Sequence, residues 1–283
     1  MSRLLFVKEG AAIWSSHLDL MRALMRSFRR AGIDLKHSQG FTPHPELSIL
    51  MPLSVGVESQ CEIAEFALAE GCAIPAGEIA PRLNPVLPAG LRAIESYEGG
   101  MKAGKLAWLR ARLTLTYEAT GNRQQATGDG GCAHACRDGS QPSACPRSDE
   151  ASGIRHQASG DGGERILRFA QNDRIEALSE LFARPSIVVE KHGKKGPTEL
   201  DIAPMIRELK AFPLGGRWPE GPDEGTSDAQ TGIVIEAVVA AQNPTLNPLL
   251  LATAIETYLP EYKPDLVQCR RLEIYDQDMN VFR

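Results

Sequence analysis

Apolar residues recur at helical spacing soon after the start of the chain. The positions that share this period are Leu18, Met21, Leu24, Met25 and Phe28. Ser16 stands where an N-cap is expected, and Asp19 follows three residues later, as in a capping box. Gly32 is the residue type that commonly ends a helix. The pattern therefore predicts a helix from His17 to about Arg30, with one apolar face.

Around this helix, the first half shows shorter periods that are typical of strands. We expect a short β segment or hairpin at 4–7 and 12–14, and strands at 47–57, 62–68 and 91–97. A weaker helical pattern covers 79–87, where Pro81 and Pro85 interrupt it. The first half therefore reads as strand, helix, strands, helix, strand.

The second half repeats this order. Alternation of Leu113, Leu115 and Tyr117 predicts a half-buried strand at 108–118. The other predicted elements are a helix at 175–182, strands at 186–191 and 199–202 around a glycine-bearing turn at 192–197, a strand at 232–240, a helix at 247–259 and a strand at 269–275. The fold class is α+β: two ferredoxin-like βαββαβ units, 1–104 and 105–283, each with helices on one face of an antiparallel sheet.

Residues 121–174 differ from the flanking sequence. They are rich in Gly, Ser, Arg and Asp, and a seven-residue pattern at 125–131 recurs at 157–163. Such a composition is typical of disorder, so we expect a disordered insertion in a surface loop, and a second mobile loop at 217–230. The insertion holds Cys132, His134, Cys136 and Cys145, whose spacing fits neither a zinc site nor the Cys-x3-Cys-x2-Cys motif of radical S-adenosylmethionine (SAM) enzymes.

Composition indicates a soluble globular protein. The chain has 283 residues, of which 42% are hydrophobic and 24% are charged. No run approaches the roughly 18 apolar residues of a membrane span, and charge appears early in 1–9, so we expect a cytoplasmic protein without membrane contact. Cys61, Cys72 and Cys269 lie in apolar stretches and are expected to be buried free thiols. No pattern predicts a metal or a cofactor.

Positive charge gathers on the first predicted helix, although the net charge of the chain is −5. Arg22, Arg26 and Arg29 are spaced i, i+4 and i+7, with Arg30 beside them, so they share one face. A solvated outer face is one interpretation. The other is contact with an anion or with RNA, because phosphates would offset the repulsion between these arginines.

The loop at 37–45 combines glycine, prolines, histidines and an aromatic residue. Ser38, Gln39, Gly40, Phe41 and His44 are candidate binding residues. Phe41 could stack on a base or fill the core, and we favour the core. His17, Asp19 and His44 are candidate acid–base groups, although each also has a structural interpretation as a cap or turn residue.

Four ordered motifs resemble a family of unknown function associated with radical SAM proteins. They are Ser-His-Leu-Asp-Leu at 16–20, Arg-Arg-Ala-Gly at 29–32, Ser-Gln-Gly-Phe-Thr-Pro-His-Pro at 38–45 and Pro-Leu-Ser-Val-Gly-Val-Glu-Ser at 52–59. The resemblance implies an accessory substrate-binding module that acts with a radical SAM partner in trans, with RNA as a candidate substrate. An RNA-processing enzyme and a structural interaction domain are the alternatives.

Overall fold

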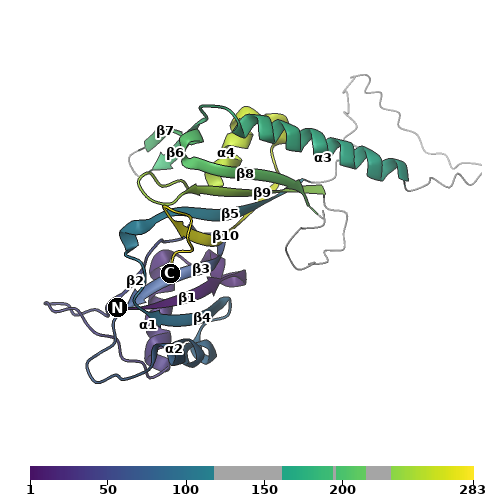
Figure 1. Ribbon diagram of the computed structural model, residues 1–283. Coiled ribbons are helices and arrows are strands. Elements are labelled where there is room, and N and C mark those ends of the chain that lie inside the picture. The colour runs from purple at the N-terminus through teal and green to yellow at the C-terminus, as the bar shows by residue number, and fades with distance from the viewer. Residues whose placement is uncertain (118–160, 194–195, 215–230) are drawn as a thin grey trace, which may run out of the picture.

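One sheet runs through both halves of the chain. The computed structural model describes residues 1–117, 161–193, 196–214 and 231–283. Its main sheet has the strand order β4-β1-β3-β10-β5-β9-β8 (Figure 1). The eighth strand, β2, lies outside this order and pairs with β3. These strands are β1 (Ser2–Lys8), β2 (Leu47–Ile49), β3 (Val57–Phe66), β4 (Leu91–Glu98), β5 (Leu106–Tyr117), β8 (Ile206–Pro213), β9 (Thr231–Ala240) and β10 (Leu266–Asp276).

Four α-helices accompany the sheet in the described ranges. They are α1 (His17–Arg30), α2 (Ala76–Leu83), α3 (Asp161–Phe182) and α4 (Leu249–Tyr258). A separate two-stranded sheet is formed by β6 (Val188–Gly193) and β7 (Gly196–Asp201). The fold is therefore a mixed α/β architecture around a mostly antiparallel sheet.

The exception to the antiparallel order is the pair that joins the two halves. Residues 57–59 of β3 pair in parallel with residues 269–271 of β10. Further along the edge of β3 that pairs with β10, residues 64–66 pair antiparallel with β2. The last strand of the chain thus extends the first half's sheet through a short parallel register.

The first helix has the bounds that the sequence predicts, but Leu18 of its predicted apolar face is 63% exposed. It begins at His17, with the Ser16 hydroxyl accepting a hydrogen bond from the Asp19 amide at 3.2 Å. Gly32 follows the helix with a φ of +67°, a conformation that glycine adopts without a steric penalty. The helix buries Leu24 and Phe28, and the Phe28 ring packs on a phenylalanine of β3 with the centroids 4.9 Å apart.

Two hydrophobic clusters lie on opposite sides of β1. Leu4 and Phe6 belong to the cluster that also contains buried residues of α1 and α2. Leu5 belongs to the larger cluster, which contains buried residues of β5, β9 and α4. This division follows from the alternation of side chains along a strand.

Several predicted elements are wrong in detail. Residues 12–14 lie in a 3-10 helix, η1 (Gly10–Trp14), and not in a β segment. The strand expected at 47–57 ends at Ile49, because Pro52 lies in the loop that leads to β3. The strand at 62–68 is part of the longer β3, and α2 begins before residue 79 and ends at Leu83.

The second half also differs from its predicted order. The strands expected at 186–191 and 199–202 form the separate β6–β7 sheet, and β8, which the prediction missed, takes the edge of the main sheet. Helix α3 begins at Asp161, so residues 161–174 are helical and not disordered. The stretch 164–170 is rich in Glu, Arg, Leu and Ala, which favour a helix.

Some predictions concern residues that the structure leaves undescribed. The remainder of the expected insertion, 121–160, lies outside the described ranges, together with the Cys132, His134, Cys136 and Cys145 cluster. The loop expected at 217–230 lies outside them as well. None of the helices in the described part of the chain has both the length and the apolar character that a membrane span requires.

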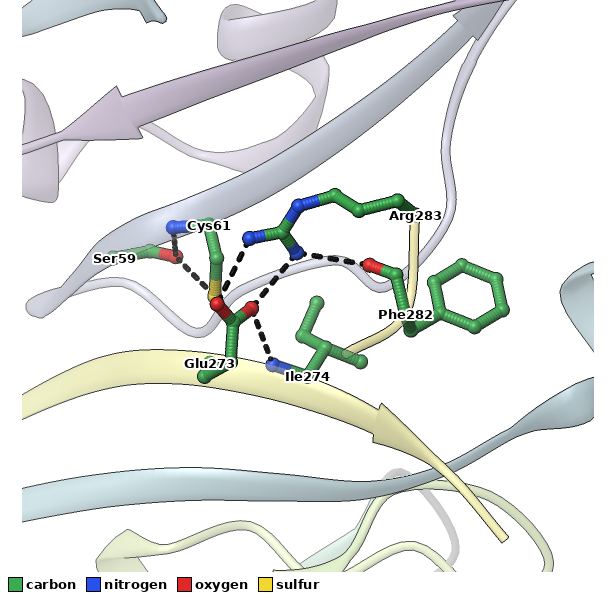
Figure 2. Close-up of polar contacts among 6 residues, drawn as sticks. All are labelled: Ser59, Cys61, Glu273, Ile274, Phe282 and Arg283. Carbon is green, nitrogen blue, oxygen red and sulfur yellow. Dashed lines mark hydrogen bonds and ion pairs between the residues drawn. The ribbon is translucent and has the colours of Figure 1, made fainter. Parts of the chain in front are cut away.

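The C-terminal tail packs onto the first half of the protein. Phe282 is fully buried, and the Arg3 guanidinium of β1 lies 5.1 Å from the centre of its ring. Figure 2 shows how Arg283 turns back so that its guanidinium meets the Glu273 carboxylate, with two contacts of 2.8 Å. The Arg283 carbonyl accepts a hydrogen bond from the Met101 amide at 2.7 Å. The tail therefore ties β10 to the chain around β1 and β4.

This packing predicts that Phe282→Ala destabilises the whole protein. Removing a fully buried phenyl ring costs about 3–5 kcal/mol in the free energy of unfolding. Val281→Ala is the matched control, because its side chain is 44% exposed and surface changes usually stay within about 0.5 kcal/mol. Urea unfolding followed by circular dichroism measures both variants. Equal stabilities would show that the tail does not anchor the sheet.

Candidate functional site

At the amino end of α1, Asp19 takes part in the helix cap and His17 does not. The Asp19 carboxylate accepts a hydrogen bond from the Ser16 hydroxyl at 2.7 Å and pairs with Arg22 at 3.3 Å. The Ser16 hydrogen bond is the main cause that lowers the pKa of Asp19. The side chain is exposed. His17 is half-buried, and its Nδ1 is enclosed without a hydrogen-bond partner in the part of the chain that the structure describes. Asp19 is therefore an ionised capping group.

The arginine stripe on α1 divides into paired and unpaired residues. Arg22 pairs with Asp19, and Arg30 donates a hydrogen bond to the Val86 carbonyl at 2.6 Å. Arg26 and Arg29 are exposed and form no ion pair or hydrogen bond within the described ranges. These two guanidinium groups remain available to a phosphate.

The loop at 37–45 is a closed hairpin. His37 and Pro45 form an antiparallel bridge, and the Ser38 amide donates to the His44 carbonyl at 2.9 Å. The Ser38 hydroxyl lies 2.9 Å from His44 Nδ1, so the histidine ring is used inside the loop. In Figure 1 this dark blue hairpin extends away from the body of the protein near the N-terminus.

Phe41 lies at the tip of this hairpin, together with Gln39 and Gly40. The exposed fraction of Phe41 is 111%, so the expectation that it fills the core is wrong. The physical reason is that the bridge between His37 and Pro45 closes the loop before the chain reaches the core residue Leu47. An aromatic ring held fully in solvent costs free energy unless a partner covers it.

The structure does not connect the candidate acid–base groups. Within the part of the chain that it describes, no hydrogen bond or ion pair joins His44 to His17 or Asp19. The same is true between the arginines of α1 and the hairpin. The predicted residues therefore form two exposed features, one on a helix and one on a loop.

The three cysteines in the described ranges are free thiols. Burial raises the pKa of Cys61 and Cys269 to about 12. The Cys61 side chain lies beside the pair between Glu273 and Arg283 (Figure 2). Cys72 is only half-buried, so the prediction of burial is confirmed for the other two alone. A thiol with so high a pKa is a poor nucleophile at neutral pH.

A buried group of charges at the junction of the halves was missed from the sequence. Arg271 of β10 donates from one nitrogen, Nη1, to Glu62 of β3 at 2.7 Å and to the Met51 carbonyl at 2.9 Å. Glu62 is fully buried, and its Oε2 has no hydrogen-bond partner among the described residues. Lys8 of β1 is 1% exposed, and burial lowers its pKa. We name Lys8, Glu62 and Arg271 the buried charge cluster.

A signal for two members of this cluster exists in the sequence. Lys8 follows Leu4 and Phe6 at a spacing of two, and both of those residues face the α1 side of the sheet. Glu62 precedes the buried Ala64 and Phe66 at the same spacing. A charged residue that occupies the next alternate position on a buried strand face indicates an internal polar site.

Breaking the buried ion pair is predicted to be costly. Arg271→Met leaves Glu62 buried without its partner, which lowers the free energy of unfolding by about 3–5 kcal/mol. The neighbouring Arg270 pairs with Glu58 where both side chains are partly exposed. Arg270→Met therefore costs about 1 kcal/mol or less. Urea unfolding at neutral pH compares the two, and equal losses would refute the distinction.

Lys8 predicts a pH dependence of stability. Its lowered pKa means that the folded state disfavours the protonated form. The stability of the native protein relative to Lys8→Met should therefore rise as pH increases from the lowered pKa to the ordinary value of 10.5. Unfolding free energies of both proteins, measured across this alkaline range, test whether the stability difference rises with pH. A difference that stays constant or falls would contradict the lowered pKa.

One protein family matches most of the chain. Its model, described as "Uncharacterized protein conserved in bacteria" (DUF2344), matches residues 2–248. The matched span contains α1, the hairpin at 37–45 and two members of the buried charge cluster. Comparison with curated proteins finds no match. The family description does not mention radical SAM proteins, so the resemblance is confirmed only as far as a family of unknown function. On the evidence of this match, the chain belongs to the DUF2344 family.

Proposed function

We propose that the chain is an accessory module that binds RNA and holds it for a separate radical SAM protein. The observation that carries this proposal is the full exposure of Phe41 at the tip of a closed hairpin. Single-stranded nucleic acids stack their bases on aromatic side chains displayed in this way. The hydrogen bonds between Ser38 and His44 hold the loop before the ligand arrives, which lowers the entropic cost of binding.

The free guanidinium groups on α1 supply the second contact. Arg26 and Arg29 lie three residues apart, so they share a helix face and repel each other. A phosphate backbone would remove this repulsion and release counterions. Arg22 and Arg30 are already bonded within the protein, so they contribute less.

The proposed architecture is a pair of ferredoxin-like units. The strand order β4-β1-β3-β2 in the first half and β10-β5-β9-β8 in the second supports it. In each half the two central strands pair antiparallel with each other and with their outer neighbours. The β6–β7 sheet would then be an insertion between α3 and the second strand of its unit.

The radical SAM partner is inferred from the motifs at 16–59. The chain has no Cys-x3-Cys-x2-Cys motif, so an iron–sulfur cluster would have to come from the partner. The acid–base enzyme is a weaker candidate, because Asp19 serves as a cap and the His44 ring bonds within its own loop. A protein-interaction domain without RNA is the remaining alternative.

RNA binding is predicted to depend on Phe41 and on the two unpaired arginines. Phe41→Ala should weaken the binding of a fluorescent single-stranded RNA by roughly five- to hundredfold, because one stacked base contributes about 1–3 kcal/mol. The double variant Arg26→Ala/Arg29→Ala should weaken it and reduce its salt dependence. Fluorescence anisotropy at low salt measures both effects.

Two matched controls belong to this experiment. Val281→Ala removes an exposed apolar side chain elsewhere, and Arg82→Ala removes an exposed arginine that pairs with Glu78 on α2. Both should bind RNA as the native chain does. Equal binding by all variants, or no binding by the native chain, would reject the RNA proposal. Capture of a radical SAM protein without RNA would favour the interaction-domain alternative.

A further inference from the structure

A cavity lies where the two halves meet. Its volume is about 120 Å³. The sheet contributes Val57 of β3, Leu109 of β5 and Arg271 of β10, while the loop after β2 contributes Leu53 and the segment before α4 contributes Asn247. Because both halves supply its walls, the cavity exists only when the sheet is continuous.

Arg271 lines this cavity and has hydrogen-bond donors that the described residues leave unused. The residue is 6% exposed, and both of its hydrogen bonds come from Nη1. Its Nε and Nη2 bond to no atom of the described residues, yet neither atom is fully enclosed by protein. The Arg271 side chain also lines the cavity, so a ligand bound there would lie beside a guanidinium with two spare donors. A buried arginine with two free donors can hold a carboxylate in a bidentate geometry.

The charges around the cavity favour an anion. Among the residues that line the cavity, Arg271 is the one charged side chain. Glu62 accepts from Nη1 alone, so an anion in the cavity would accept from the donors that Glu62 leaves unused. Asn247 and Pro248 place the amino end of α4 at the cavity wall, and a helix dipole adds positive potential there.

The size and the apolar walls restrict the ligand further. Leu53, Val57 and Leu109 surround the space with aliphatic side chains. An engineered apolar cavity of about 150 Å³ binds benzene. A free phosphate or a nucleotide would leave polar oxygens against these walls. A small organic acid with one short apolar body fits the space and the charge together.

We infer that this cavity binds a small monocarboxylate, whose carboxylate meets Arg271 and whose apolar body lies between the halves. The site is separate from the hairpin and the arginines of α1. A test that rejects the proposed RNA binding therefore leaves the inference about the cavity unaffected, and the reverse also holds.

Calorimetry on the full chain with benzoate and 3-methylbutanoate tests this inference. At least one of the two acids should bind saturably and raise the melting temperature of the protein. The neutral amides, benzamide and 3-methylbutanamide, should bind about tenfold more weakly or worse, because they lack the charged contact with Arg271. Equal binding of acid and amide, or no binding of either acid, would overturn the inference.

Variants locate the binding. Leu53→Trp fills the cavity from its loop without touching the charges and should abolish binding of the acids. Val55→Trp is the matched control on the same loop, because Val55 is 51% exposed and lies outside the cavity. The double variant Arg271→Met/Glu62→Met removes the donors together with the buried carboxylate, and it should lose the preference for acid over amide. If the double variant does not fold, the binding measured with Leu53→Trp tests the site by itself. Unchanged binding in Leu53→Trp would overturn the site.

Discussion

The short parallel pairing between β3 and β10 is the constraint on which the arrangement of this protein depends. β10 closes the second half, and without β3 it would present an open sheet edge to solvent. Pairing with Val57–Ser59 covers that edge at residues 269–271 and joins two sets of strands into one sheet. The bond between Arg271 and Glu62 lies beside this register, and it joins residues that are 209 positions apart in the chain.

This junction explains features that otherwise look unrelated. Glu62 and Arg271 are buried because the halves close over them, and each would carry a large desolvation penalty without the other. The same junction forms the cavity between the loop after β2 and the segment before α4. The C-terminal tail then continues from β10 toward β1, where Phe282 packs under Arg3. The exposed hairpin at 37–45 and the arginines of α1 belong to the first half alone.

The sequence predicts local features well and long-range ones poorly. Helix α1 was predicted nearly to the residue, because its period and its Ser16 cap are encoded within one short stretch. β8 was missed because an edge strand with several exposed positions shows only a weak alternation. Phe41 was misplaced because hydrophobicity alone cannot show whether a loop folds inward. The pairing of Arg271 with Glu62 could not be predicted, since no local pattern relates strands so distant in the chain.

Native-state hydrogen exchange at the β3–β10 junction tests this account most directly. If the parallel register holds the halves together, the amides of residues 57–59 and 269–271 will exchange only through global unfolding. The strands of both halves will then share one free energy of opening. Exchange at the junction with a much lower free energy than in the central strands, or separate unfolding of the two halves, would contradict a single continuous sheet.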